Sequence, residues 1–229
     1  MNVIITGASK GIGYELAKKF ARDGHQVIAI ARSIEKLQQL DKELQSDHFS
    51  FLQFDLATVD YGEELIPFVN AHFKKVDILI NNAGLLVNKL LADLTDDDFD
   101  QTFNVNVKST FKLVRELLPF FSDQAHIVNI SSMGGFQGSA KFPGLSLYSA
   151  SKAAVAVFTE CLAEELKSRN IKANALALGA VQTEMLSQAF PGYQAPLQSN
   201  EMADFIADFA YTGHRYFNGK ILPVSLTTP

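Results

Sequence analysis

The chain has 229 residues, of which 47% are hydrophobic and 20% charged, with both charge signs dispersed and a formal net charge of −5 at pH 7. This composition is typical of one globular domain and argues against a phosphate-backbone partner such as DNA or RNA. No apolar run approaches the roughly 20 residues of a membrane helix, no basic leader precedes the first apolar run, and Cys161 is the only cysteine, so we expect a cytoplasmic protein without a membrane partner.

Short apolar, β-branched runs alternate with longer helical patterns along the whole chain. Strands are predicted over 2–6, 26–30, 49–54, 76–80, 125–131, 171–177 and 220–224. Helices are predicted over 12–23, 33–46, 60–73, 96–121, 149–169 and 200–211. Several strand runs are continuously apolar, as expected for strands covered on both faces. The alternation predicts one doubly wound α/β domain over residues 1–229, with about seven parallel strands and helices on both faces.

The acidic stretch TDDDFD at 95–100 allows two interpretations. As a metal loop it lacks the glycine and the distal glutamate of a calcium site. Thr95 as N-cap, with Asp96, Asp97 and Asp98 at the positive end of a helix, explains it better. The five histidines are scattered without ligand spacing, so we assign no metal.

The first predicted strand runs directly into the glycine-rich stretch TGASKGIGYELAKKF, with glycines at 7, 11 and 13. Glycine permits the tight turn and the close approach of a ligand, and the free N–H groups of the following helix attract a pyrophosphate. The strand-before, helix-after context favours a dinucleotide site, although a merely tight turn between strand and helix is the alternative.

The end of the second predicted strand indicates which dinucleotide binds. An NAD site usually has an acidic residue there, which bonds the ribose 2′-hydroxyl. This chain has Ala31 at that place, Arg32 beside it, and Lys10 within the glycine turn. Two cations and no carboxylate favour the 2′-phosphate of NADP(H), because arginine binds phosphate bidentately. A solvated strand end is the alternative interpretation of Arg32.

Seven short motifs occur in one order along residues 2 to about 185. They are TGASKGIG (6–13), FDL (54–56), NNAG (81–84), NVNV (104–107), NISS (129–132), YSASK (148–152) and LGAVQTEM (178–185). Together they resemble the short-chain dehydrogenase/reductase family, whose domain is a Rossmann fold. The resemblance implies an NADP-dependent carbonyl reductase that takes a small-molecule carbonyl or alcohol substrate.

The resemblance also implies which residues bind the coenzyme. Asp55 and Leu56 would flank the adenine, and Asn82 would line the cleft, although turn formation is an alternative role for an asparagine before a glycine. The complete predicted coenzyme set is Gly7, Ser9, Lys10, Gly11, Ile12, Gly13, Arg32, Ser33, Asp55, Leu56, Asn82, Ala83, Gly84, Ile130, Tyr148, Lys152, Gly179, Val181 and Thr183.

Tyr148 and Lys152 are four residues apart and therefore share one face of a predicted helix. By spacing alone they are better explained as surface side chains with apolar stems, because this spacing is common by chance. By resemblance, Tyr148 is the general acid, Lys152 lowers the pKa of the phenol and binds the nicotinamide ribose, and Ser132 hydrogen-bonds the reacting oxygen. Asn106 completes this set by helping to hold a water beside Lys152.

Three features depart from the family pattern. The interval from Ser132 to Tyr148 is about three residues longer than usual, which we expect to reshape the substrate mouth. Leu178 replaces the common proline before Gly179, and the C-terminal tail lacks the usual acidic-glycine ending. The segment at about 184–200 is expected to form a short substrate lid, with a hydrophobic cap on the core as an equal alternative.

Two other functions remain open at this stage. A non-catalytic NADP(H)-binding redox sensor or regulator needs the glycines and Arg32 but no proton donor, so Tyr148 and Lys152 favour the enzyme. An epimerase or dehydratase usually needs a larger substrate domain than this length provides. By resemblance, we expect a homodimer or homotetramer that associates through the helices 96–121 and 149–169.

Overall fold

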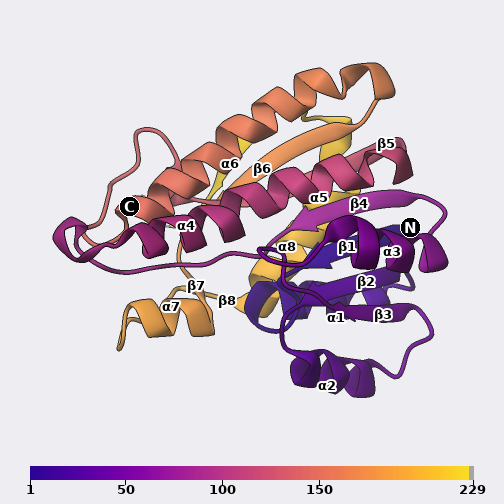
Figure 1. Ribbon diagram of the computed structural model, residues 1–229, viewed down its shortest axis with the longest axis horizontal. Helices are drawn as coiled ribbons and strands as arrows, with labels where there is room; N and C mark the ends of the chain where they lie inside the picture. Colours follow the sequence, from indigo (N-terminus) through magenta and orange to yellow (C-terminus); the bar gives the residue numbers. More distant parts are fainter. Residues whose placement is uncertain (227–229) are drawn as a thin grey trace.

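The computed structural model describes residues 1–226, which are organised around a parallel sheet of seven strands (Figure 1). The order across the sheet is β3-β2-β1-β4-β5-β6-β9, and all neighbours run parallel. The strands are β1 (Asn2–Thr6), β2 (Gln26–Ala31), β3 (Phe49–Gln53), β4 (Val76–Asn81), β5 (Phe121–Ser132), β6 (Lys172–Leu178) and β9 (Ile221–Val224). The predicted doubly wound, seven-stranded fold is confirmed.

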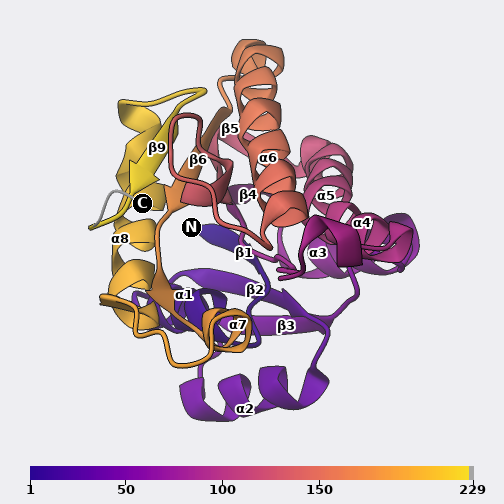
Figure 2. The same cartoon turned by 90° about the vertical axis from the view of Figure 1, so that its left-hand side faces the viewer.

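Helices cover both faces of the sheet (Figure 2). They are α1 (Gly11–Arg22), α2 (Ile34–Leu44), α3 (Ile66–His72), α4 (Asp96–Phe103), α5 (Ser109–Leu117), α6 (Ser146–Glu165), α7 (Glu184–Ala189) and α8 (Ser199–Thr212). Because alternate strand residues point to opposite sides, Val3 and Ile5 pack with α1, α2 and α8, whereas Ile4 packs with α3, α5 and α6. None of the helices within residues 1–226 has the length and apolar character needed to cross a bilayer.

The predicted helix over 96–121 is interrupted in the structure. It consists of α4, a π-helical stretch at Asn104–Lys108, α5, and a final 3₁₀ turn at Leu118–Phe120. Pro119 lies in that turn, and α5 ends before it because proline lacks the N–H donor that a continuing helix needs. Strand β5 then begins at Phe121, four residues earlier than expected, and its pairing with β4 shifts register before Ile78 meets His126.

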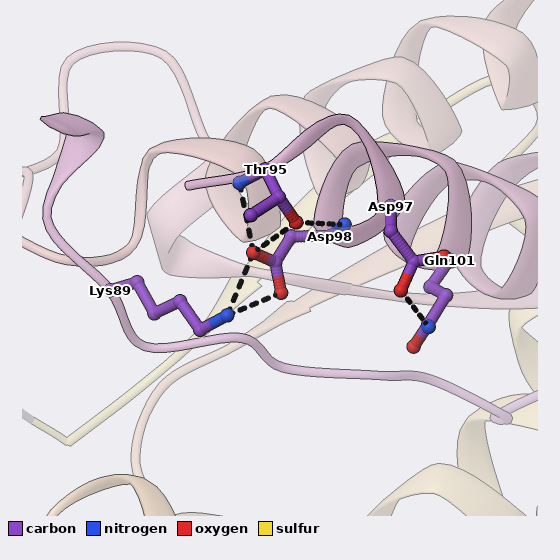
Figure 3. A network of polar contacts seen from close by, with 5 residues as sticks. All are labelled: Lys89, Thr95, Asp97, Asp98 and Gln101. Carbon is purple, nitrogen blue, oxygen red and sulfur yellow. Dashed lines mark hydrogen bonds and ion pairs between the residues drawn. The ribbon is translucent and has the colours of Figure 1, made fainter. Parts of the chain in front are cut away.

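The acidic stretch at 95–100 begins α4 (Figure 3). The Thr95 hydroxyl accepts a hydrogen bond from the backbone N–H of Asp98 at 3.1 Å, and the Asp98 carboxylate accepts one from the Thr95 N–H at 2.9 Å. Lys89 Nζ donates to both Asp98 oxygens at 2.8 Å and, together with these caps, lowers the pKa of Asp98 to about 2. The N-cap interpretation of this stretch is confirmed.

The segment between β6 and α8 carries α7 away from the main sheet (Figure 1). Two short parallel strands, β7 (Val181–Gln182) and β8 (Leu197–Gln198), join the beginning and end of this segment. Thr183 caps α7 by accepting a hydrogen bond from the Leu186 N–H at 3.1 Å. The two ends of this segment therefore lie side by side at the β7–β8 pair, and α7 between them lies in the region predicted as a lid.

Candidate active site

A cavity of about 730 Å³ opens at the carboxyl ends of the strands. It lies where the strand order changes direction between β1 and β4, which is the usual position of a ligand site in an open α/β sheet. All the predicted catalytic and coenzyme-binding residues line this cavity except Gly13 and Asn106. The fold thus brings together residues from position 7 to position 183 of the chain.

The glycine turn after β1 supplies one wall of the cavity. Gly7 has a φ of +70°, which favours glycine, and its N–H donates to the Ile30 carbonyl at 2.9 Å. Helix α1 starts at Gly11, and the Lys10 side chain at its N-cap position makes no capping hydrogen bond. The first N–H groups of α1 are consequently available to an anionic ligand.

Asn82 and Thr6 hold this turn against the end of β4. The Asn82 side-chain amide donates to the Thr6 carbonyl at 3.0 Å and more weakly to the Gly7 carbonyl at 3.4 Å. The Thr6 hydroxyl accepts from the backbone N–H groups of Asn82 and Ala83 at 3.1 and 3.0 Å. Asn82 therefore shapes the turn as well as lining the cavity, so both of its predicted roles find support in its contacts.

Two charged residues of this corner, Lys36 and Glu184, were not predicted from the sequence motifs. The ammonium of Lys36, in the first turn of α2, pairs with the Glu184 carboxylate at 3.3 Å, and the predicted Lys10 pairs with the same carboxylate at 3.5 Å. Arg32 lies exposed beside them, and all four residues line the cavity. Lys36 follows the helix-capping Ser33 by three residues, and that spacing was an available signal. Glu184 lies 148 residues away from Lys36 and has no such signal.

The catalytic candidates lie on α6 and at the end of β5. Lys152 is almost fully buried, and its Nζ donates to the Ile130 carbonyl at 2.8 Å. Nζ also lies 5.8 Å from the centre of the Tyr148 ring. Ser132 makes a hydrogen bond with Tyr148, and its hydroxyl accepts one from the Gly134 N–H at 3.1 Å. The phenol, the hydroxyl and the ammonium thus share one end of the cavity.

The protonation of this group differs from the expectation. Burial raises the pKa of the Tyr148 phenol, and the hydrogen bond with Ser132 opposes that effect only partly. Burial also lowers the pKa of the Lys152 ammonium to about 8. The expected net lowering of the Tyr148 pKa by Lys152 is therefore wrong for this structure, because desolvation outweighs the effects that favour the phenolate.

Asn106 lies behind the cavity wall, in the π-helical stretch between α4 and α5. Its side chain accepts from the Leu85 N–H at 2.7 Å and donates to the Leu85 carbonyl at 2.9 Å and the Ser151 hydroxyl at 2.8 Å. Asn106 thereby ties the strand β4 exit to α6. A Cβ at Gly84 would lie 3.4 Å from Lys152 Nζ, so glycine leaves room beside the ammonium.

The chain is similar to known proteins over most of its length. The family model described as short chain dehydrogenase matches residues 1–194. The chain belongs to the short-chain dehydrogenase family. The resemblance found in the seven motifs is thereby confirmed.

Among related short-chain dehydrogenases is the 3-oxoacyl-(acyl-carrier-protein) reductase FabG of Thermotoga maritima, with 37% identity over 80% of this chain and 74% of that protein. An uncharacterized oxidoreductase of Staphylococcus aureus strain MW2 is 30% identical over 89% of this chain and 87% of its own length. The 3-ketoacyl-(acyl-carrier-protein) reductase of Brucella melitensis, solved in complex with NADH, superposes with a TM-score of 0.87 at 26% identity, covering 98% and 96% of the chains. A tyrosine-to-phenylalanine variant of ElxO with NADPH bound gives 0.84 at 29% identity, covering 98% and 96%.

The departures from the short-chain dehydrogenase pattern are accommodated locally. Leu178 is buried, and the N–H of Gly179 donates to the Val224 carbonyl of β9 at 2.9 Å, which holds the turn without proline. The longer interval before Tyr148 forms a loop whose Phe142 and Leu145 line the cavity. The C-terminal tail is described only as far as position 226, so residues 227–229 of the atypical ending lie outside the described part.

Proposed function

We propose that this protein is an NADPH-dependent oxidoreductase that reduces a ketone, aldehyde or 3-oxoacyl carbonyl to an alcohol, with Tyr148 as the general acid. The observation that carries this proposal is the convergence of Tyr148, Ser132 and Lys152 on the cavity that the glycine turn also lines. A sensor that only binds the coenzyme would not need a buried phenol and ammonium beside it. The oxidoreductase names and bound nucleotides of the relatives support the same reading.

The cavity fits a nicotinamide dinucleotide on structural grounds. A Cβ at Gly7 would meet the Ala83 Cα at 2.9 Å, and a Cβ at Gly13 would lie 2.4 Å from the Gly7 carbonyl, so only glycine allows this turn. Gly7, Gly11 and the start of α1 would hold the pyrophosphate, and Asp55 and Leu56 would flank the adenine. The bound coenzyme supplies the hydride that reduces the carbonyl carbon.

The proton comes from this chain. Tyr148 would donate its phenolic proton to the carbonyl oxygen, and Ser132 would hold that oxygen by a hydrogen bond. At pH 7 Lys152 remains mostly protonated, because its pKa of about 8 lies above that pH. Its buried positive charge would stabilise the phenolate left after donation, since charges interact more strongly where water is excluded.

The selection of NADPH would depend on the cationic corner beside the adenosine ribose. Lys10, Arg32 and Lys36 line it, and β2 ends in Ala31 rather than in an acid. Ser33 adds a hydroxyl at the start of α2. Three cations and a helix N-terminus favour a dianionic 2′-phosphate over a neutral hydroxyl.

Replacing Tyr148 by phenylalanine tests the catalytic proposal. The variant should still bind NADPH and lose at least about 100-fold in turnover, a typical loss for a general acid. NADPH absorbance would be followed with a panel of aldehydes, diketones, quinones and 3-oxoesters. If neither protein oxidised NADPH with any compound while both bound it equally, the non-catalytic sensor would be the better description.

Replacing Arg32 by alanine tests the coenzyme proposal. The affinity for NADPH should fall by about tenfold, equivalent to the loss of about 1.4 kcal/mol, while the affinity for NADH stays nearly constant. Both dissociation constants are measurable by fluorescence titration of the reduced coenzymes. An equal loss for the two coenzymes would reject the assignment of Arg32 to the 2′-phosphate.

We also propose that α7 within 184–200 acts as the substrate lid and that the protein associates through α4, α5 and α6. Phe99, Phe111 and Val157 are exposed on these helices at 47%, 43% and 57%, which is apolar surface suited to a second copy. Sedimentation of a monomer only would contradict the association. A reducing cytoplasm suits the single cysteine, Cys161, which is exposed and free.

A further inference from the structure

Three loops enclose the catalytic end of the cavity and are joined through residues 88 and 89. The Asn88 side-chain amide donates to the Ala189 carbonyl at the end of α7, at 2.8 Å. The neighbouring Lys89 N–H donates to the Gly144 carbonyl in the loop before α6, at 3.1 Å. Figures 1 and 2 show that α7 and the loop before α6 lie at the same end of the molecule as α4. The loops therefore form one continuous wall around the entrance.

The inner surface of this wall is apolar. It presents Leu86, Phe142, Leu145, Met185 and Phe190 to the cavity. The charged side chains that line the cavity within residues 1–226 are Lys10, Arg32, Lys36, Asp55, Lys152 and Glu184. All except Lys152 belong to the proposed coenzyme end, and Lys152 is assigned to the reaction. A substrate in the catalytic end thus meets apolar surface and no further ionic partner among the described residues.

An acidic cluster adjoins this wall at Lys89, and Figure 3 shows two of its members, Asp97 and Asp98. Aspartates occupy positions 93, 96, 97, 98 and 100 at and before the start of α4. The ammonium of Lys89 is already bound by Asp98. The ammonium of Lys141, in the loop before α6, donates to the Phe136 carbonyl at 2.8 Å and to the Ser139 carbonyl at 3.1 Å. Both lysines keep their positive charge, but the five aspartates outnumber them, so an approaching anion meets a net negative charge beside the start of α4.

We propose that the catalytic end of this cavity accepts neutral, apolar carbonyl compounds and disfavours acyl thioesters delivered on an anionic carrier. The apolar wall binds such a compound by removing its surface from water, and the acidic cluster repels a carrier that bears phosphates. This inference rests on the proposed function, because it identifies the substrate class of the same site. It separates this chain from the 3-oxoacyl-carrier substrates in the names of two of its relatives.

The test compares substrates that share a 3-oxo group and differ in charge. Ethyl acetoacetate and ethyl benzoylacetate are neutral, whereas acetoacetyl-coenzyme A carries phosphates. With NADPH, kcat/KM should be at least about tenfold higher for the neutral esters at low ionic strength. High salt should raise kcat/KM for the thioester and leave the ethyl acetoacetate value nearly constant, because only the charged substrate is repelled.

Two variants separate the wall from the acidic cluster. Phe142→Ala should lower kcat/KM for ethyl benzoylacetate by about tenfold through a higher KM, whereas Phe205→Ala, an exposed phenylalanine on α8, should change nothing. Asp96→Asn combined with Asp100→Asn should raise kcat/KM for the thioester several-fold without affecting the esters.

The outcomes distinguish the two proposals. A higher kcat/KM for acetoacetyl-coenzyme A than for both esters would overturn the inference and leave the proposed carbonyl reduction intact. Equal responses of Phe142→Ala and Phe205→Ala would also overturn it. If no compound of either class caused NADPH oxidation, both the proposed carbonyl reduction and the inferred substrate class would be rejected.

Discussion

Replacing Gly13 by alanine would have two opposite effects on stability, a gain in helix propensity and a loss from steric overlap. Gly13 lies in the first turn of α1, where alanine is normally favoured over glycine by about 1 kcal/mol. However, the new Cβ would lie 2.4 Å from the Gly7 carbonyl oxygen and 2.5 Å from Asn82 Nδ2, whereas ordinary contacts begin at 3.4 Å. The turn and the helix would have to separate by 3.4 − 2.4 = 1.0 Å.

The steric effect should be larger than the helix propensity. Overpacking of this kind costs about 1–3 kcal/mol, which less the propensity gain leaves a net loss of up to about 2 kcal/mol in the free energy of unfolding. The same displacement moves the N–H groups of the turn away from their phosphate-binding positions. The affinity for NADPH should therefore fall by at least about tenfold, as expected when an oriented set of donors is misplaced.

Urea unfolding and fluorescence titration with NADPH would measure the two effects. Gly24→Ala is the matched control, because Gly24 has a φ of +80° and open space around its Cβ position. That variant should lose about 1–2 kcal/mol of stability through backbone strain alone and keep its affinity for NADPH. A higher urea midpoint for Gly13→Ala with unchanged NADPH affinity would refute the steric reasoning.

Three further predictions concern ionisable side chains. Lys152→Met should abolish turnover yet add about 1–3 kcal/mol to the unfolding free energy at pH 7 in urea titrations, because burial disfavours the charged lysine. As the pH rises from about 8 toward 10.5, the stability of the wild type should rise toward that of the variant, because the lysine then becomes neutral in both the folded and the unfolded state. Burial, with a smaller effect of His214, lowers the pKa of His126 to about 4. Between pH 6.5 and 4 the imidazole is therefore protonated in the unfolded state but not in the folded state, so the free energy of unfolding should fall by about 3 kcal/mol over this range. His126→Gln should remove that part of the pH dependence of the urea midpoint; an identical profile would contradict the assignment. The Glu184 carboxylate pairs with Lys10 and Lys36, which are proposed to hold the 2′-phosphate, and would therefore compete with that phosphate for them. Glu184→Gln should raise the affinity for NADPH several-fold and leave the affinity for NADH unchanged, whereas equal changes for both coenzymes would argue against this competition.

Local patterns in the sequence accounted for the elements and their starts. Each of the seven strands was visible as a short apolar run, because both faces of a parallel sheet are buried and the side chains on them must be apolar. Thr95 marked the start of α4 because its hydroxyl and the acid three residues later cap each other within one turn. The ordered motifs identified the family, and nearly all the site residues predicted from them line the cavity.

The tertiary structure decided what depends on contacts between distant parts of the chain. Lys36 meets Glu184 across 148 positions, and Asn88 meets Ala189 across 101, so no local period in the sequence reports either pair. The direction of the Tyr148 pKa shift also required the fold, since spacing places Lys152 one turn away but does not measure desolvation. Residue type and spacing determine which groups a helix or strand presents, whereas the packing of those elements determines how much water and charge each group meets.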